Sequence, residues 1–182
     1  MDVAGSLDVI WRRDLHQCLS ASLMAAGSGA LIVAGKWSRL FRLDPATGET
    51  LWEVSIKTAN GICAVSGDAC IYVDRRETMT CFDLATGAVR WSTKDEYMNE
   101  YLCVAGVSVL TGGYHPLHAR NIATDEMLWS YGSQEYSGYA EKFCRPLAHS
   151  NGVLITHAGV TSFVTSTRVL VPKCSGGSCL NW

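Results

Sequence analysis

The sequence contains a ten-residue segment that returns at a nearly constant spacing, and this repeat limits the folds open to the chain. Residues 43–52 read Leu-Asp-Pro-Ala-Thr-Gly-Glu-Thr-Leu-Trp, and residues 82–91 read Phe-Asp-Leu-Ala-Thr-Gly-Ala-Val-Arg-Trp. A partial third copy spans residues 120–129. The tryptophans that end the three copies stand 39 and 38 residues apart, and Trp11 precedes the first of them by 41. A period near forty residues indicates a fold built from repeated structural units.

Each unit is predicted to contain four short strands. The Asp-x-x-Thr-Gly turn is typical of a hairpin, because Asp and Thr side chains cap the turn and Gly accepts a positive φ. In the second unit two further apolar stretches, 62–65 and 70–73, come before the hairpin and are separated by Ser-Gly-Asp. The third copy has Asn121 and Asp125 where the others have Asp and Gly. Asn caps turns and Asp tolerates left-handed backbone, so this hairpin is expected to form as well.

Four strands in about forty residues are typical of one blade of a β-propeller. The Leu/Phe-Asp-x-x-Thr-Gly-x-x-x-Trp pattern resembles the PQQ-type (quinoprotein-like) repeat over roughly residues 11–164. In that family the tryptophan packs between adjacent blades, so the resemblance implies the same role for the tryptophans here. The residues expected to carry the architecture are Trp11, Trp52, Trp91, Trp129, Gly48 and Gly87.

The repeat therefore predicts an all-β fold, a β-propeller of about four four-stranded blades over residues 1–170, followed by a Cys/Gly/Ser-containing tail at 171–182. The blades are expected near residues 20–56, 60–95 and 100–131, with a fourth that uses 145–148, 153–157 and 161–165. No Thr-Gly hairpin follows residue 165, so we expect the fourth blade to lack its outer strand and residues 7–15 to supply it. Alternatively, self-association would complete the ring, or the chain would be part of a larger, divided propeller.

Composition narrows the class of protein. Apolar residues make up 48% of the chain, which argues against disorder. The net charge of −2 offers no electrostatic attraction for nucleic acid or for an anionic membrane surface. No apolar run approaches the roughly 20 residues of a membrane helix. Residues 1–5 lack the basic and apolar regions of a signal peptide, so a cytoplasmic location is expected.

Cysteines and histidines give weak signals for a metal site. Cys63, Cys81 and Cys103 lie in apolar stretches, where buried free thiols are expected. Cys174 and Cys179 lie in the polar tail without further ligands at zinc-site spacing, so a reduced tail is expected. Positions 115 and 118 of a strand point to opposite faces, so their two histidines favour ordinary loop and strand-edge residues. No metal site is predicted.

The family resemblance raises the question of catalysis. Dehydrogenases of the family hold a quinone beside a disulfide of adjacent cysteines and near a calcium ion. This chain has no Cys-Cys pair, no evident set of calcium ligands and no Gly-x-Ser-x-Gly nucleophile motif. We therefore predict no cofactor and no catalytic residue, and expect that the protein is not an enzyme. A quinone-binding remnant, or the sensor module of a larger enzyme, is the alternative.

Two connections between the predicted blades are rich in tyrosine, a residue common in protein interfaces. In a propeller these connections share one face with the loops between second and third strands. We expect this face to bind a protein or peptide, which makes the chain a scaffold; the alternative is that the rings only cover blade edges. The predicted binding residues are Trp37, Arg75, Arg76, Tyr97, Tyr114, His115, Tyr136 and Tyr139.

Overall fold

The structure is a computed structural model of the 182-residue chain. It describes residues 9–13, 22–35, 38–58, 61–74, 78–94, 101–112, 117–131, 147–149, 152–157, 160–165 and 168–170. Within these ranges every regular element is a β-strand, and the strands form four antiparallel sheets of four strands each. The expected all-β propeller architecture is confirmed.

The strands of each sheet are consecutive in the chain. The first sheet contains β1 (Ser22–Gly27), β2 (Ala30–Gly35), β3 (Arg39–Leu43) and β4 (Thr50–Ser55). The second contains β5 (Ile62–Ser66), β6 (Ala69–Val73), β7 (Thr78–Asp83) and β8 (Val89–Lys94). The third contains β9 (Tyr101–Ala105), β10 (Ser108–Gly112), β11 (Leu117–Asn121) and β12 (Met127–Tyr131). The fourth contains β13 (Leu147–His149), β14 (Gly152–His157), β15 (Val160–Thr165) and β16 (Arg168–Leu170).

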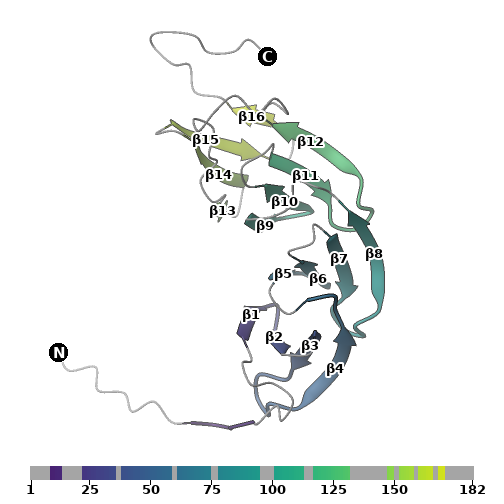
Figure 1. Cartoon of the computed structure of the whole chain (residues 1–182). Helices are drawn as coiled ribbons and strands as arrows, with labels where there is room; N and C mark the ends of the chain where they lie inside the picture. The colour runs from purple at the N-terminus through teal and green to yellow at the C-terminus, as the bar shows by residue number, and fades with distance from the viewer. Residues whose placement is uncertain are drawn as a thin grey trace, which may run out of the picture.

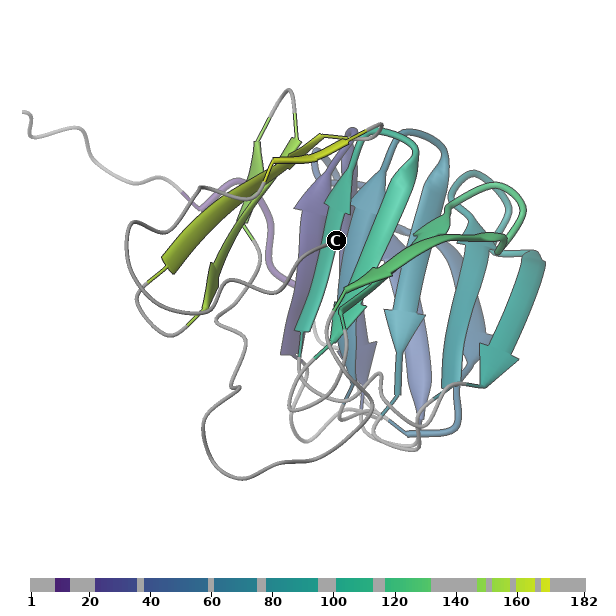
Figure 2. The same ribbon diagram turned by 90° about the horizontal axis from the view of Figure 1, so that it is seen from above.

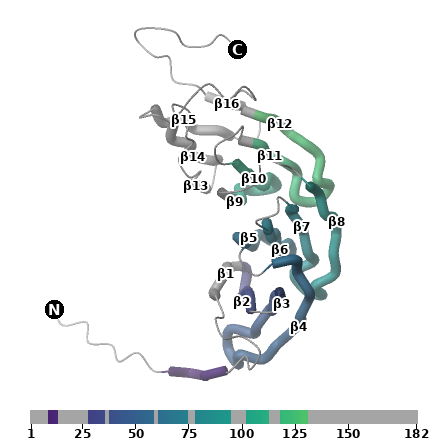
Figure 3. Tube along the Cα trace, in the orientation of Figure 1, coloured from purple at the N-terminus to yellow at the C-terminus, as the bar shows by residue number. Residues whose placement is uncertain are grey.

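The four sheets follow one another along an arc (Figure 1). The first strands β1, β5, β9 and β13 lie on its concave side, where β1 contacts β5, β5 contacts β9 and β9 contacts β13. The long outer strands β4, β8 and β12 lie on the convex side (Figure 3). Seen from above, strands of the first three sheets stand side by side like neighbouring blades (Figure 2). This is the radial arrangement of a propeller.

The fourth sheet corrects one expectation. It was expected to lack its outer strand, but Arg168–Leu170 forms β16 and pairs antiparallel with β15 through Val164 and Val169. No Thr-Gly turn announces this strand, and it has only three residues. Residues 9–13 take no part in the fourth sheet and lie instead against the first. Among the described residues no strand pairing closes the arc into a ring.

The repeated turns form as the residue types predict. In the first sheet Gly48 has a φ of 72°, its backbone N–H donates to the Asp44 carbonyl at 2.7 Å, and the Asp44 carboxylate accepts from the Ala46 N–H at 2.7 Å. In the third sheet Asn121 and Asp125 reproduce this turn, with a φ of 63° at Asp125. The expectation that the substituted turn persists is therefore confirmed.

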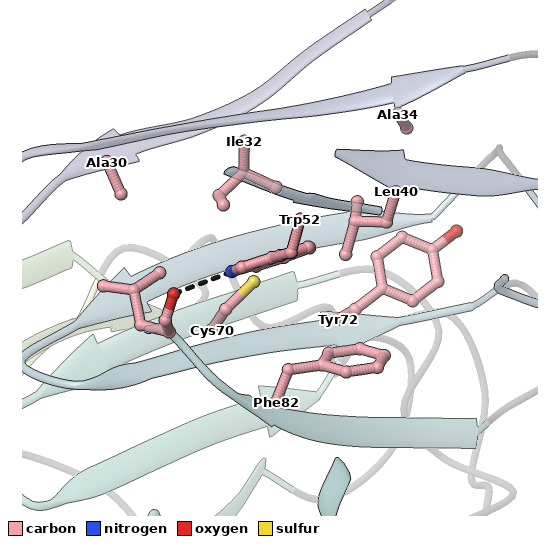
Figure 4. Packing of buried hydrophobic residues seen from close by; sticks show 9 residues of the cluster. Ala30, Ile32, Ala34, Leu40, Trp52, Cys70, Tyr72 and Phe82 are labelled. Carbon is pink, nitrogen blue, oxygen red and sulfur yellow. Dashed lines mark hydrogen bonds between the residues drawn. The ribbon is translucent and has the colours of Figure 1, made fainter. Parts of the chain in front are cut away.

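Buried side chains fill the two spaces between the first three sheets. Between the first and second sheets lie Ile32 and Leu40, both fully buried, together with Trp52 and Phe82 (Figure 4). The rings of Trp52 and Phe82 stack with their centroids 6.5 Å apart. The largest fully buried member of the second cluster is Ile71 of β6. Since the second sheet contributes to both clusters, it could not bury its two apolar faces alone.

A tryptophan connects the first sheet to the turn of the second, and another connects the second to the turn of the third. The indole N–H of Trp52 donates to the Leu84 carbonyl at 2.8 Å, and that of Trp91 donates to the Ile122 carbonyl at 2.7 Å. Leu84 and Ile122 occupy the same place in their repeats, one residue after the turn-capping Asp or Asn. The Trp52 ring also lies against Gly87, where an added Cβ would come within 3.0 Å of it. The glycine thus provides both the turn geometry and the space for the ring.

The outer strands β4, β8 and β12 each contain an irregularity directly before their tryptophan. Arg42 pairs with Trp52 and the next residue, Leu43, pairs with Thr50, which leaves Leu51 without a partner. The same shift in register occurs in the second and third sheets. An extra residue in one strand is a β-bulge, which redirects the side chain that follows it. The bulge therefore sets the direction in which each tryptophan points.

We predict that Gly87→Ala destabilises the protein more than Gly67→Ala does. Both glycines have positive φ, so each alanine costs about 1–2 kcal/mol in backbone strain. No atom lies within 4 Å of a Cβ added at Gly67, whereas the one added at Gly87 meets the Trp52 ring. Overpacking there should cost about 1–3 kcal/mol more. Urea unfolding followed by circular dichroism measures both variants; equal losses of stability would contradict a tight ring-to-glycine contact.

Candidate functional site

The strand order gives the blades two different ends. The turn between first and second strands and the Asp-x-x-Thr-Gly hairpin of each sheet lie at one end, here called the hairpin end. The connections between second and third strands, and those from one sheet to the next, lie at the opposite end, here called the loop end. The eight residues predicted to bind a partner belong in sequence to loop-end connections. All eight lie outside the described residues, so their role stays a prediction.

The second sheet shows how strand ends are held together at the loop end. The backbone N–H of Asp74 donates to the Thr78 carbonyl, and the Thr78 N–H donates to the Asp74 carboxylate, both at 2.9 Å. Both residues are buried. They flank the segment that contains Arg75 and Arg76. Reciprocal bonds of this kind fix the separation of the two strands from which the segment emerges.

Polar contacts also tie the first sheet to the second at the loop end. The backbone N–H of Ile56 donates to the Ser38 carbonyl at 2.8 Å, and the Ser38 hydroxyl donates to the Lys57 carbonyl at 3.3 Å. The Lys57 ammonium then donates to the hydroxyl of Thr78 at 3.3 Å, which crosses to the second sheet. Ser38 has a φ of 55° and directly follows Trp37 in the sequence. The described part of this end is thus a connected framework.

Tyr72 is a further member of this framework. Its hydroxyl donates to the Thr58 carbonyl in the link between the first two sheets. Burial raises the pKa of the Tyr72 phenol to about 12, so it stays protonated and able to donate at neutral pH. A Cβ added at Gly61 would collide with the Tyr72 ring and with the Val73 carbonyl. The link therefore follows the surface of the second sheet closely at this point.

A compact charge cluster lies at the hairpin end of the second sheet. The Arg90 guanidinium is 2.7 Å from the carboxylates of both Asp68 and Asp83. Hydrogen bonding from Arg90, and then from Thr86, lowers the pKa of Asp83 to about 2. Hydrogen bonding to Arg90 also lowers the pKa of Asp68, and these two carboxylates raise the pKa of Arg90. Arg90 thus joins two carboxylates through charge-assisted hydrogen bonds within the second sheet.

Arg90 occupies the bulge position of its outer strand. The corresponding residues of the first and third sheets are Leu51 and Leu128, so the charge cluster belongs to the second sheet alone among these three. Sequence reasoning missed the contact, because Asp68 and Arg90 stand 22 residues apart and no motif joins them. The shared offset of the three bulge residues from their tryptophans is the signal that could have found it.

The described cysteines are free thiols. Cys81 and Cys103 are buried, which confirms the expectation for them, and Cys63 is half-buried. The Cys63 sulfur lies 3.6 Å from that of Cys70 on the neighbouring strand. Hydrogen bonding with Cys70 and burial raise the pKa of Cys63, and burial raises that of Cys81 to about 11. Such thiols are poor nucleophiles and metal ligands at neutral pH. Cys174 and Cys179 lie outside the described residues.

The described residues show neither a metal-ligand cluster nor a membrane-spanning helix. Within the described ranges, no three His, Cys, Asp or Glu side chains come together as a metal ion would require. His118 is buried on β11, and His115 lies outside the part of the chain that the structure describes. The described ranges also contain no helix long and apolar enough to span a membrane.

We predict that Arg90→Leu, which copies the other two sheets, removes a pH-dependent part of the stability. An unfolded Asp titrates near pH 3.9, above the folded pKa of about 2 at Asp83. The stabilisation is therefore fully present above about pH 5 and is lost as the pH falls toward 2. The difference in unfolding midpoint between the wild type and the variant, measured in urea from pH 7 to 3, should narrow at low pH. A constant difference would contradict the prediction.

The chain is similar in sequence to known propeller proteins. The family model for outer membrane protein assembly factor BamB matches residues 5–168. The outer membrane protein assembly factor BamB of Nitrosomonas eutropha is 28% identical over 132 residues, which cover 70% of this chain and 32% of that protein. The chain thus spans about a third of the length of this curated relative.

Solved structures show the same fold. The crystal structure of BamB from Moraxella catarrhalis matches with a TM-score of 0.61 and 18% identity, over 80% of this chain and 47% of that one. The computationally designed Ika4 protein matches with a TM-score of 0.64 and 12% identity, over 87% of this chain and 98% of that one. At such identities the likeness establishes the architecture, and the site must be argued from the residues themselves.

Proposed function

Because the chain belongs to the outer membrane protein assembly factor BamB family, we propose that it is a propeller scaffold that binds a protein or peptide partner through its loop end. Membership in this propeller family supports a protein-interaction role in general. The relative from Nitrosomonas eutropha is named as an assembly factor, a class of protein that acts on other proteins. The partner proposed here is accordingly a polypeptide, and not a nucleic acid or a small cofactor.

The observation that carries this proposal is the framework at the loop end. The contacts from Lys57 to Thr78 and between Asp74 and Thr78 hold the strand ends in place. The connections that leave these strands contain the aromatic and basic residues, Trp37, Arg75 and Arg76 among them. A rigid support that presents variable connections is a common arrangement for recognition. Aromatic and Arg side chains dominate the binding energy of many protein interfaces.

We propose that the protein catalyses no reaction. The described thiols Cys63 and Cys81 have raised pKa values, which keeps them protonated at neutral pH. The carboxylates of Asp68 and Asp83 are both held by Arg90 within the second sheet. These groups therefore serve the structure. The cytoplasmic location expected from the sequence stays a prediction.

We predict that replacing Tyr136 and Tyr139 together by Ala weakens partner binding at least about tenfold, which corresponds to 1.4 kcal/mol. Proteins retained by the immobilised full chain, quantified by mass spectrometry, measure the effect, and circular dichroism checks that the variant is folded. Val107→Ala is the matched control, since Val107 is an exposed apolar side chain at the hairpin end. Equal retention by the wild type and the tyrosine variant would reject the loop end as the binding surface.

We predict that the quinone of the family dehydrogenases, added together with calcium, leaves the melting temperature unchanged. A ligand present at 100 times its Kd would stabilise the folded state by about 2.7 kcal/mol, a shift that thermal unfolding detects readily. The experiment separates the scaffold from the alternative of a quinone-binding remnant. A rise in melting temperature that requires both additions would support the remnant instead.

A further inference from the structure

Two cysteines meet in the space between the first and second sheets. Cys63 lies on β5 and Cys70 on the neighbouring strand β6. Their sulfur atoms are 3.6 Å apart, close enough for one thiol to donate a hydrogen bond to the other. Both side chains belong to the apolar cluster that surrounds Trp52, and Cys70 lies beside that ring in Figure 4. The two thiols are therefore already in contact in the folded protein.

The strand register places the two cysteines on the same face of the second sheet. Cys63 lies opposite Tyr72 and Val65 lies opposite Cys70, so the cysteines are diagonal neighbours. Diagonal neighbours in an antiparallel pair lie about 7–8 Å apart, whereas the Cα atoms of a disulfide usually lie about 4.4–6.8 Å apart. A bond between the two sulfurs therefore requires β5 to shift slightly against β6.

The position of β5 allows such a shift. It is the edge strand of the second sheet on the concave side of the arc, and among the described strands it forms a ladder with β6 alone. The turn between β5 and β6 contains Gly67, and no atom lies within 4 Å of a Cβ added there. An edge strand opens more easily than a central strand, because fewer hydrogen bonds hold it.

The two thiols differ in their access to solvent. Cys63 is half-buried, whereas Cys70 is fully buried. A reagent in solution therefore meets Cys63 first, and Cys70 stands in contact behind it. Oxidation-sensitive cysteines often combine an accessible thiol with a second one that resolves the first product. Cys81 of the same sheet provides a contrast, because it is fully buried and its sulfur lies against the carbonyl oxygens of Phe82 and Ile122.

We propose that Cys63 and Cys70 form an internal disulfide by exchange with a low-molecular-weight disulfide. The Cys63 thiolate attacks one sulfur of the reagent, which forms a mixed disulfide and releases a first reagent thiolate. The Cys70 thiolate then attacks the Cys63 sulfur and releases the second. The two reagent thiolates take up the protons that the cysteines lose, so two electrons pass to the reagent and the protein gains one S–S bond. This bond ties β5 covalently to β6.

The environment of Cys63 makes the exchange slow at neutral pH. Hydrogen bonding with Cys70 and burial raise the pKa of the Cys63 thiol. Only the thiolate attacks a disulfide, so a small fraction of the protein reacts at any moment. A thiolate of high pKa is, however, intrinsically more nucleophilic, which offsets part of this loss. The exchange is therefore best followed at about pH 8.5 over hours.

Trypsin provides a direct test, because residues 58–75 form one tryptic peptide that contains Cys63, Cys70 and no further cysteine. The folded full chain is incubated with oxidised glutathione, unfolded in urea with iodoacetamide, digested and analysed by mass spectrometry. We expect this peptide to become two hydrogen atoms lighter and to escape alkylation, and dithiothreitol to reverse both changes. The peptide of residues 77–90, which contains Cys81, should be alkylated in every sample.

Two variants separate a pair from a single reactive thiol. In Cys70→Ala the second step is impossible, so Cys63 should stop at the mixed disulfide with glutathione. Cys81→Ala is the matched control and should form the internal disulfide as the wild type does; circular dichroism checks that both variants are folded. The wild-type peptide decides the proposal even if a variant does not fold. Full alkylation of both its cysteines, or accumulation of the mixed disulfide in place of the internal bond, would overturn the proposal.

Discussion

The contact between a tryptophan and the turn of the following sheet is the interaction on which the arrangement of the blades depends. For Trp52 it combines a hydrogen bond to the Leu84 carbonyl, packing of the ring on Gly87 and burial among the side chains of two sheets. A hydrogen bond of this kind contributes about 0.5–1.5 kcal/mol, and burial of the indole contributes more. The contact also requires the bulge that leaves Leu51 unpaired, since the bulge directs the ring.

Most of the fold could be predicted from the sequence because its turns are encoded by neighbouring residues. The turn of the third sheet was predictable even with Asn121 and Asp125 in place of Asp and Gly, since these residues accept the same backbone geometry. β16 was not predictable, because no turn signal precedes it. The bulges and the pairing of Arg90 with Asp68 were missed for a related reason, since both arise between strands, and their constant position before the tryptophan does not by itself indicate a bulge or an ion pair.

Only part of the candidate site could be predicted from the sequence. The strand ends at the loop end could be placed from the repeat alone, and the framework of Lys57, Asp74 and Thr78 gives them a physical basis. The partner could not be derived, because aromatic composition indicates contact chemistry without geometry. Arg90 shows that the bulge position does not require one residue type, since the same position is leucine in the first and third sheets. The bulge position thus accepts either residue, whereas the position after it is tryptophan in all three sheets.

The direction of the tryptophan contacts has a consequence for synthesis on the ribosome. Each indole reaches forward along the chain, and its acceptor carbonyl lies 31 to 34 residues later. At about 5–20 residues per second, an emerging tryptophan would wait roughly 2–7 seconds for the turn that covers it. Each blade therefore becomes fully protected only after most of the next one has been translated. Until that turn emerges, the indole has no carbonyl to accept its hydrogen bond and no turn to cover its ring.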